Sequence, residues 1–373
     1  MSTRANRLNW RQLILPGATL VALGSLFGFT GCQGSPSGEK TTTPSVSVAN
    51  AQTQDIAKPA PYKFSEAHPF DGSKAMDILK KQCDFGVRPI GTPAHEKLKE
   101  YLISEMKKYA DETVAQEFKY RGIPVTNVIG VFNPAGSDKP SERPILLMTH
   151  WDTRPIADGP YSTLVRNGVR FKFGSTGWKP IAPIMGANDA ASGVGVLLEL
   201  ARIFKEKRPK VGVIMLLDDG EDYGDFQADD HKGEGVELGA RYFAKNFKTD
   251  KRFGFPMYGI LLDMVGARGA FFVPEQNSIS AASSVNLKVF EIGGELGYKK
   301  IFRSEGIQEV GDDHLSIIEA GIPTIDLIHP LPFNEYQTTG YTHWHTLQDT
   351  ADKCSADTLK AVGDTVAEVI YRE

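Results

Sequence analysis

Three short apolar runs in this chain predict buried parallel strands, and side chains of the type that binds metals follow each of them. The runs and the side chains after them are 145–148 with His150 and Asp152, 211–217 with Glu221 and Asp222, and 260–262 with Asp263. In open α/β sheets, ligands bind beyond the carboxyl ends of the strands. We therefore expect these side chains to meet at one edge of a sheet, although they are far apart along the chain.

Two further candidate ligands lie outside these runs. Asp189 stands among small residues in GANDAASG, where the backbone can approach a ligand closely. An Asp at this place would also serve as a helix N-cap, so its position alone leaves both roles open. His345 follows Trp344, and His343 lies two residues earlier, on the same face of an extended segment. Histidine and carboxylates, without thiolates, are the ligand set of a catalytic Zn²⁺ site.

Glu221 and Asp222 are adjacent carboxylates directly behind a predicted buried strand. Such a pair is costly unless a cation neutralises one of its members. A metal ligand next to a general acid/base would explain the pair. The run DDGEDYGDFQADD also fits a solvated acidic loop, and Asp218 and Asp219 just before the pair leave the assignment of roles open.

The alternation of strand-like and helix-like segments predicts an α/β fold. We expect a single domain with a twisted, mostly parallel mixed sheet and helices on both of its faces. Residues 113–118 and 126–132 predict two antiparallel strands at one edge of that sheet. The other expected strands are 145–149, 211–217, 258–264, 270–273 and 324–328. Helices are expected at 74–81, 96–109, 189–205, 238–246, 284–296, 314–320 and 355–371, with a long loop at 153–185.

Residues 1–31 have the pattern of a secretory signal peptide, in which arginines precede an apolar stretch that ends at small residues. Cys32 directly after a Gly resembles the lipidation site of bacterial lipoproteins; a plain cleaved signal and an N-terminal anchor are the alternatives. We therefore expect an exported protein, held at the membrane through a lipid on Cys32 and facing the periplasm or the cell exterior. Residues 32–63 are rich in Ser, Thr and Pro and predict a disordered tether, so the catalytic domain would span 64–373.

Composition excludes several other classes of protein. A formal net charge of -4 does not favour a nucleic-acid partner. The chain has no GxSxG motif and no Gly-rich phosphate motif, so serine-nucleophile and nucleotide-binding functions have no support.

Cys83 and Cys354 are the cysteines of the expected mature domain beyond Cys32, and they either pair or stay as separate thiols. The oligomeric state is not encoded in any of these patterns.

Taken in order, the motifs HWD, GANDAASG, GED, LLDMVGA, DDH and WHTLQDT resemble those of the zinc aminopeptidases of clan MH, the M28-like superfamily. The resemblance covers about residues 80–373. Within this superfamily the chain is most similar to the glutaminyl-peptide cyclotransferases, or glutaminyl cyclases. The details that favour this branch are Phe271 after LDMVGA, the doubled acid of Asp312 and Asp313, Trp344 before His345, and GED before Tyr223.

This resemblance implies one Zn²⁺ per chain, with Asp189, Asp222 and His345 as its ligands. Glu221 would be the catalytic acid/base. The animal cyclases have Glu at the position of Asp222, and since Asp is one methylene shorter, the strand that carries it must lie closer to the metal.

The resemblance also implies a substrate pocket beside the metal. Asp263 and Asp312 would form a hydrogen-bonded pair next to the acid/base. The pocket would be walled by Trp344 together with Phe333, and Tyr223 would lie near it.

The implied activity is zinc-dependent cyclisation of the N-terminal glutamine of peptides and proteins to pyroglutamate, with release of ammonia. The alternative is an aminopeptidase with two Zn²⁺ ions, in which residues like His150 and Asp263 hold the second ion and Asp189 bridges the pair. Because every one of these positions is occupied here, both readings stay open. His150 and Asp152 are then either ligands of a second metal or support for the first.

Overall fold

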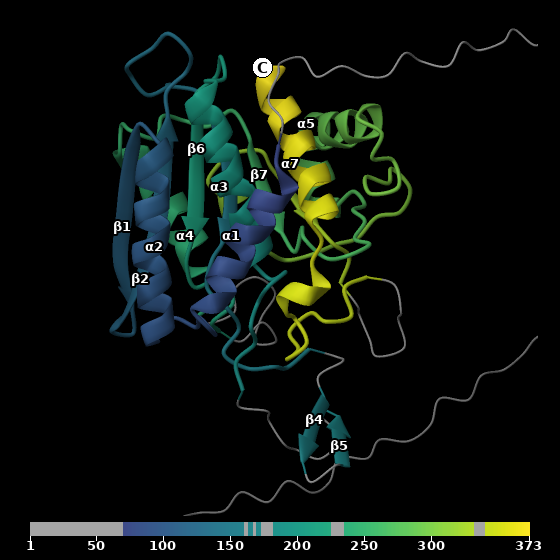
Figure 1. The fold of residues 1–373 in the computed structure, drawn as a ribbon. Helices are drawn as coiled ribbons and strands as arrows, with labels where there is room; N and C mark the ends of the chain where they lie inside the picture. Colours follow the sequence, from purple (N-terminus) through teal and green to yellow (C-terminus); the bar gives the residue numbers. More distant parts are fainter. Residues whose placement is uncertain (1–69, 160–162, 167–168, 173–181, 225–234, 332–339) are drawn as a thin grey trace, which may run out of the picture. The chain divides into compact units, whose positions relative to one another are not determined.

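A mixed β-sheet lies at the centre of this computed structural model (Figure 1). The structure describes residues 70–159, 163–166, 169–172, 182–224, 235–331 and 340–373. Within these ranges, the main sheet has six strands in the order β1-β2-β6-β3-β7-β8. Their bounds are β1 Glu112–Tyr120, β2 Ile123–Phe132, β3 Ile145–His150, β6 Val213–Asp218, β7 Gly259–Asp263 and β8 Thr324–Ile328. β3, β6, β7 and β8 run parallel, whereas β2 pairs antiparallel with both β1 and β6.

Helices bury both faces of this sheet. The helices that pack into the larger core are α1 Gly72–Asp84, α2 Pro93–Tyr109, α3 Ala191–Glu206, α5 Gln276–Glu295 and α7 Ala356–Tyr371. The opposite core holds α4 Leu238–Asn246, the short η1 Phe247–Thr249 and α6 His314–Glu319. In Figure 1, α1, α3 and α7 lie in front of the strands and α4 lies behind them.

The central strands are apolar along their whole length because both of their faces are covered. On β3, Ile145 and Leu147 pack into the larger core, while Leu146 and Met148 pack into the opposite one. Successive side chains of a strand point to opposite faces, so a continuous apolar run serves two cores at once. This is why the run at 145–148 predicts a strand buried on both sides.

Several helices begin where the sequence supplies a capping side chain. Asp71 Oδ1 accepts from the backbone N–H groups of Ser73 and Lys74 and starts α1. Thr92 caps α2, which has Pro93 at its first position. By contrast, the N-cap of α3 is Ala190, which makes no side-chain cap bond. Asp189 is therefore not a helix cap, and its carboxylate is used elsewhere.

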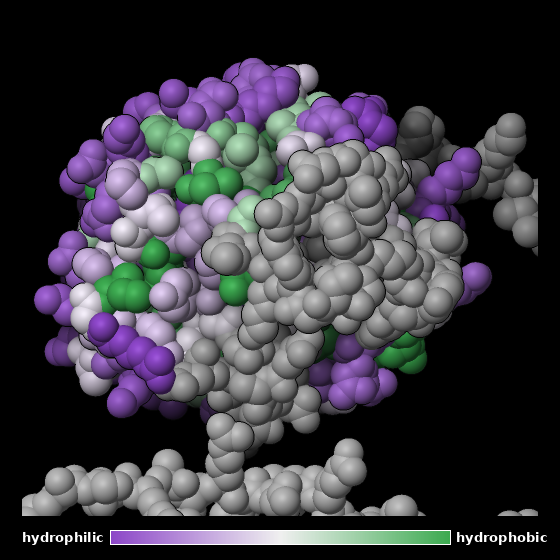
Figure 2. Space-filling view, turned by 90° about the horizontal axis from the view of Figure 1, so that it is seen from below, coloured by the Kyte–Doolittle hydropathy of each residue, from purple (hydrophilic) through white to green (hydrophobic). Residues whose placement is uncertain are grey.

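The parallel strands end together at the lower edge of the sheet in Figure 1. The register aligns His150 on β3 with Asp218 on β6, and Asp263 on β7 with Ile328 on β8. Figure 2 looks at this edge from below: on the described part of the face, hydrophilic residues gather along the rim and hydrophobic residues form small separate patches. The polar side chains predicted at the strand ends thus meet at one edge.

The predicted fold class is confirmed, and most expected elements form within a few residues of their predicted bounds. The strand expected at 270–273 is wrong, because only Phe272 bonds to a neighbouring segment, at an isolated bridge with Phe302. α5 starts at Gln276, before the predicted residue 284, since Glu275 caps it; the helix is interrupted by a non-helical Ala282.

Two further corrections concern the loops. The expected long loop at 153–185 contains a separate two-stranded sheet, made of β4 Thr163–Arg166 and β5 Val169–Lys172. A short 3-10 helix, η2 Ala351–Lys353, precedes α7. Cys83 and Cys354 are both free thiols.

The predictions for the N-terminal signal, Cys32 and the tether fall on residues 1–69, outside the described residues, and they stay predictions. In the part of the chain that the structure describes, no helix has both the length and the apolar character needed to cross a membrane.

Candidate metal centre

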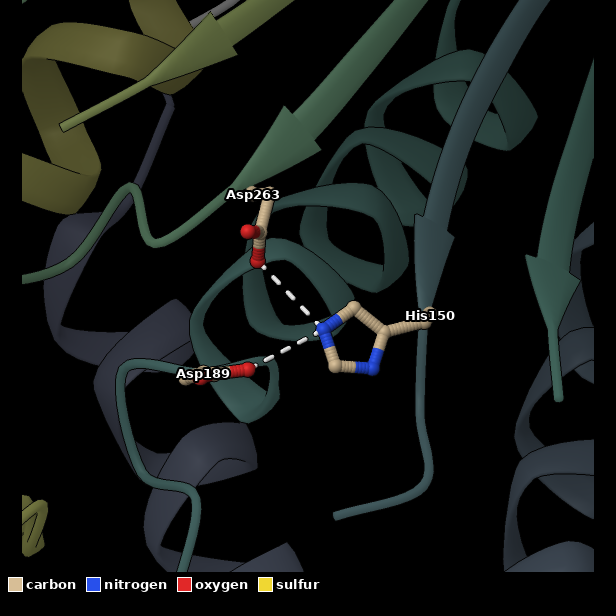
Figure 3. Close-up of side chains that lie close together, drawn as sticks. All are labelled: His150, Asp189 and Asp263. Atoms are coloured by element: carbon tan, nitrogen blue, oxygen red, sulfur yellow. Dashed lines mark ion pairs between the residues drawn. The ribbon is translucent and has the colours of Figure 1, made fainter. Parts of the chain in front are cut away.

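The first group of candidate ligands is His150, Asp189 and Asp263, shown in Figure 3. His150 ends β3, Asp263 ends β7 and Asp189 lies just before α3. Nε2 of His150 lies 3.2 Å from Asp189 Oδ1 and 3.4 Å from Asp263 Oδ1. All three side chains are buried, so the charges of these groups face one another and not solvent.

The second group is Asp189, Asp222 and His345. Nε2 of His345 lies 3.2 Å from Asp222 Oδ1 and 3.6 Å from Asp189 Oδ2. Asp189 therefore turns one oxygen toward each group and joins them. The metal ligands that the resemblance implies come from three separate loops and meet here.

The residues present fit a zinc ion on two counts. Zn–O and Zn–N bonds of about 2.0–2.2 Å place neighbouring tetrahedral ligand atoms about 3.4 Å apart, which matches these distances. In addition, Nε2 of His150, both carboxylate oxygens of Asp222, and Oδ1 of Asp263 are buried without a hydrogen-bond partner. Buried polar atoms are rarely left unpaired, so these atoms have the setting of metal ligands. Each group of three has its ligand atoms within 4.8 Å of one another, so the described residues offer two adjoining positions.

The electrostatics of the cluster also favour a cation. Burial lowers the pKa of His150, yet the carboxylates of Asp152, Asp189 and Asp263 outweigh this and raise it well above its usual value. Burial likewise lowers the pKa of His345, but Asp222 and the other neighbouring carboxylates raise it to about 9. So strong an anionic field on both imidazoles is what a divalent cation would compensate.

Glu221 has the setting of a general acid/base. Its carboxyl lies 3.9 Å from His150 Nε2 and belongs to neither ligand group. Burial raises its pKa well above the ordinary value; His150 partly opposes this shift, and the negative charges of Asp222 and Asp312 add to it. A carboxyl whose pKa is raised toward the working pH can both accept and return a proton.

Asp152 supports His150 and the loop after β6, and it belongs to neither ligand group. Its Oδ1 and Oδ2 accept from the backbone N–H groups of Glu221 and Asp222, at 3.1 and 3.3 Å. Its Oδ1 also lies 3.4 Å from Nδ1 of His150. A carboxylate behind an imidazole in this way orients the ring and fixes its tautomer.

Asp312 lies at the same pocket as Asp263, but between these two described residues the structure has no hydrogen bond. The backbone N–H of Asp313 donates to Asp312 Oδ1 instead, at 2.6 Å. Burial and then the charge of Asp263 raise the pKa of Asp312 well above its usual value. Burial also raises the pKa of Asp263, and the contact with His150 partly opposes that shift.

A cavity of about 250 Å³ adjoins both ligand groups. Its apolar lining residues are Met264, Val310, Ile328, Leu331 and Trp344. The ring of Trp344 stacks on that of His345, with centroids 4.0 Å apart. Tyr223 is not among the described residues that line this cavity, and its ring lies edge-on to that of Tyr120 of β1. Neighbouring side chains of this loop point in different directions: Asp222 faces His345, whereas Tyr223 faces Tyr120. Phe333 lies outside the described residues.

Sequence reasoning missed the residues that hold the ligand loops. Asp349 accepts from the backbone N–H groups of Asn188 and Asp189, at 2.9 and 3.1 Å, and from the hydroxyl of Tyr341. Arg154 and Asp158 lie in the segment treated as a loop, and they contact Asp222 and His345. Asp349 could have been found from its place in WHTLQDT. Nothing in the sequence marks Arg154 or Asp158, because an Arg or an Asp in a loop usually faces solvent.

Glycine at 193 allows α3 to approach the strand ends. A Cβ there would lie 2.2 Å from Thr149 Oγ1 and 2.4 Å from the carbonyl oxygen of Leu262. No real Cβ tolerates such contacts, so only glycine lets the helix start this close to β3 and β7. Asp189 is placed between the two histidines by this close packing.

Comparison with known proteins identifies the family. Residues 127–370 match Peptidase family M28. The chain belongs to this family. A glutaminyl cyclase of Bacteroides thetaiotaomicron, solved with bound N-acetylhistamine, is 36% identical; the match covers 82% of this chain and 98% of that one, with a TM-score of 0.68. A Zn-dependent exopeptidase of Parabacteroides distasonis is 35% identical, with coverage of 82% and 99% and a TM-score of 0.69.

A curated relative, aminopeptidase YwaD of Bacillus subtilis, is 25% identical over 193 residues. That match spans 52% of this chain and 38% of the relative, so the chain covers well under half of the relative's length. The protein is thus an enzyme of the M28 superfamily with two groups of candidate metal ligands, and the solved structures similar to it include both glutaminyl cyclases and Zn-dependent exopeptidases.

Proposed function

We propose that this enzyme cyclises the N-terminal glutamine of peptides and proteins to pyroglutamate and releases ammonia. The observation that carries the proposal is the small, partly apolar cavity lined by Glu221 and by Trp344, which stacks on the ligand His345. At about 250 Å³ the described cavity lies below the ~300–1,000 Å³ of typical ligand pockets, so it suits a single side chain. The similarity to glutaminyl cyclases supports this assignment.

In this proposal Asp189, Asp222 and His345 hold one zinc ion, which when bound would act as a Lewis acid on the carboxamide oxygen of the substrate. The α-amine nitrogen of the substrate attacks its own side-chain carboxamide carbon, and the ring C–N bond forms. Glu221 accepts the proton that the amine loses and returns it to the departing nitrogen, which leaves as ammonia. The buried position of Glu221 keeps its pKa high enough for both transfers.

The chain's other residues position the substrate and exclude water. Because the nucleophile belongs to the substrate, holding the side chain folded toward the amine supplies much of the rate. The apolar wall of Trp344, Leu331 and Ile328 suits the methylene groups of glutamine. The same wall disfavours a hydrolytic water beside the carboxamide.

The second candidate is a dinuclear aminopeptidase, and one observation favours it. His150, Asp189 and Asp263 form a second complete ligand group next to the first. In the proposed cyclase, His150 and Asp263 instead pair with each other, at 3.4 Å, and the second position carries no metal.

Zinc content separates the two candidates. Purified wild-type protein should bind one Zn²⁺ per chain, measured by atomic absorption. Asp222→Ala should lose it, whereas Asp263→Ala should keep it while pyroglutamate formation drops. Two Zn²⁺ per chain, falling to one in Asp263→Ala, would instead support the aminopeptidase.

A further inference from the structure

The segment that follows β3 crosses the loops that carry two of the metal ligands. Arg154 is buried, and its Nη1 donates to the carbonyl oxygens of Asp222 and Gly224, at 3.0 and 2.7 Å. Nη1 also lies 3.6 Å from Oδ1 of Asp222. One guanidinium therefore fixes both the backbone and the carboxylate of this ligand.

The same guanidinium holds Asp158 in a two-point contact. Nε of Arg154 donates to Asp158 Oδ1 at 3.1 Å, and Nη2 donates to Oδ2 at 2.6 Å. Paired contacts of this kind fix the carboxylate plane as well as its distance. Asp158 is thereby aimed at the third loop, the one that carries His345.

Asp158 Oδ1 lies 3.1 Å from Nδ1 of His345. The other ring nitrogen, Nε2, is the atom that faces Asp222 and Asp189. A carboxylate that accepts from Nδ1–H leaves the Nε2 lone pair for the metal and makes it a stronger donor. The contact thus selects the tautomer that a ligand requires.

The backbone of the same segment also holds His345. The N–H of Gly159 donates to the carbonyl oxygen of His345 at 3.0 Å. A Cβ on Gly159 would lie 2.0 Å from the carbonyl oxygen of Trp344, so only glycine allows this approach. His345 itself has φ 51, in the left-handed region that non-glycine residues seldom adopt, and needs such support.

We propose that Arg154 and Asp158 are a positioning pair that fixes Asp222 and His345 and so sets the zinc affinity of this ligand group. His150, by contrast, has its own outer partner, because the carboxylate of Asp152 lies next to its Nδ1. The proposal concerns metal binding, so it holds whether the enzyme cyclises glutamine or hydrolyses peptides.

The test measures zinc dissociation constants of the purified protein by competition with a chromophoric chelator. Asp158→Ala and Arg154→Met should each weaken zinc binding by roughly 10–100-fold, the usual effect of losing an outer partner of a ligand. Asp158→Asn should lose less, because its amide oxygen can still accept from Nδ1–H. Arg154→Met should lose at least as much as Asp158→Ala, because Arg154 also holds Asp222 directly, and the double variant should lose little more than Arg154→Met alone.

Arg202→Met is the matched control. Arg202 makes a similar two-point contact with Glu199 within α3, at 2.9 and 2.6 Å, and neither residue belongs to the metal centre. Wild-type zinc affinity in Asp158→Ala and Arg154→Met would overturn the proposal. An equal loss in Arg202→Met would also overturn it, because the effect would then be general destabilisation. If Asp158→Ala or Arg154→Met fails to fold, as judged by its thermal transition, the zinc affinity of Asp158→Asn decides. Weaker zinc binding than in the wild type supports the proposal, and wild-type zinc binding overturns it.

Discussion

At the residue scale, Glu221 carries the proposed proton transfer without being a ligand. Glu221→Gln keeps the size of the side chain but cannot take up the proton. We expect zinc content to stay at the wild-type level and turnover to fall by about 10²–10⁴-fold. Both are measured on one preparation. Loss of zinc in this variant would mean that Glu221 is the ligand and Asp222 the acid/base.

His329 is a residue-scale source of acid sensitivity. Burial, and then the charge of Arg303, lower its pKa to about 4, and its Nδ1 has no hydrogen-bond partner. Unfolded chain takes up this proton near pH 6.5, whereas folded protein does so only near pH 4. Stability from the neutral ring is thus complete above pH 6.5 and is lost as the pH falls toward 4, by up to ~3 kcal/mol.

His329→Gln should remove this dependence. The free energy of unfolding, measured by denaturant on zinc-free protein, should fall less between pH 6.5 and 4 in the variant than in the wild type. Parallel pH profiles for the two proteins would contradict the assignment.

At the element scale, the start of α3 depends on a glycine. Gly193→Ala forces a Cβ against Thr149 and the backbone of Leu262, and such overpacking costs about 1–3 kcal/mol. Gly294→Ala in α5 is the control, because its Cβ would meet only Lys299, at 3.6 Å. The control should be neutral or slightly stabilising, by ~0.5–1 kcal/mol. Equal thermal shifts in both variants would argue against close packing at α3.

Much of the element order was predictable, because periodicity reports what covers a strand or a helix. The run at 145–148 predicted β3 since both of its faces are buried. The segment at 270–273 misled because a short apolar run can be buried in a loop as well as in a strand. The position of Asp263 at the end of a predicted strand indicated that it lies at the metal centre. By contrast, no pattern in the sequence around Asp158 indicates its contact with His345, which lies 187 residues away along the chain. The contact of Tyr223 with Tyr120 was equally hidden, since the direction of a loop side chain depends on its neighbours in space.

At the scale of the whole molecule, the metal should stabilise the fold. The centre gathers buried carboxylates and imidazoles from loops after β3, β6, β7 and β8, and a cation relieves their mutual repulsion. A ligand at 100 times its Kd adds about 2.7 kcal/mol to the free energy of unfolding. We expect a chelator to lower Tm and added Zn²⁺ to restore it, with Asp222→Ala insensitive to both. An unchanged Tm in the wild type would contradict a built zinc site.

The most direct test of the proposed function is the mass of the product from a peptide with N-terminal glutamine. Wild-type enzyme should convert it to a species lighter by one ammonia with every peptide bond intact, and it should leave the matching peptides with N-terminal leucine or alanine unchanged. Shortened peptides and free amino acids from the leucine and alanine peptides, with no loss of ammonia from the glutamine peptide, would contradict cyclisation and make this enzyme an aminopeptidase.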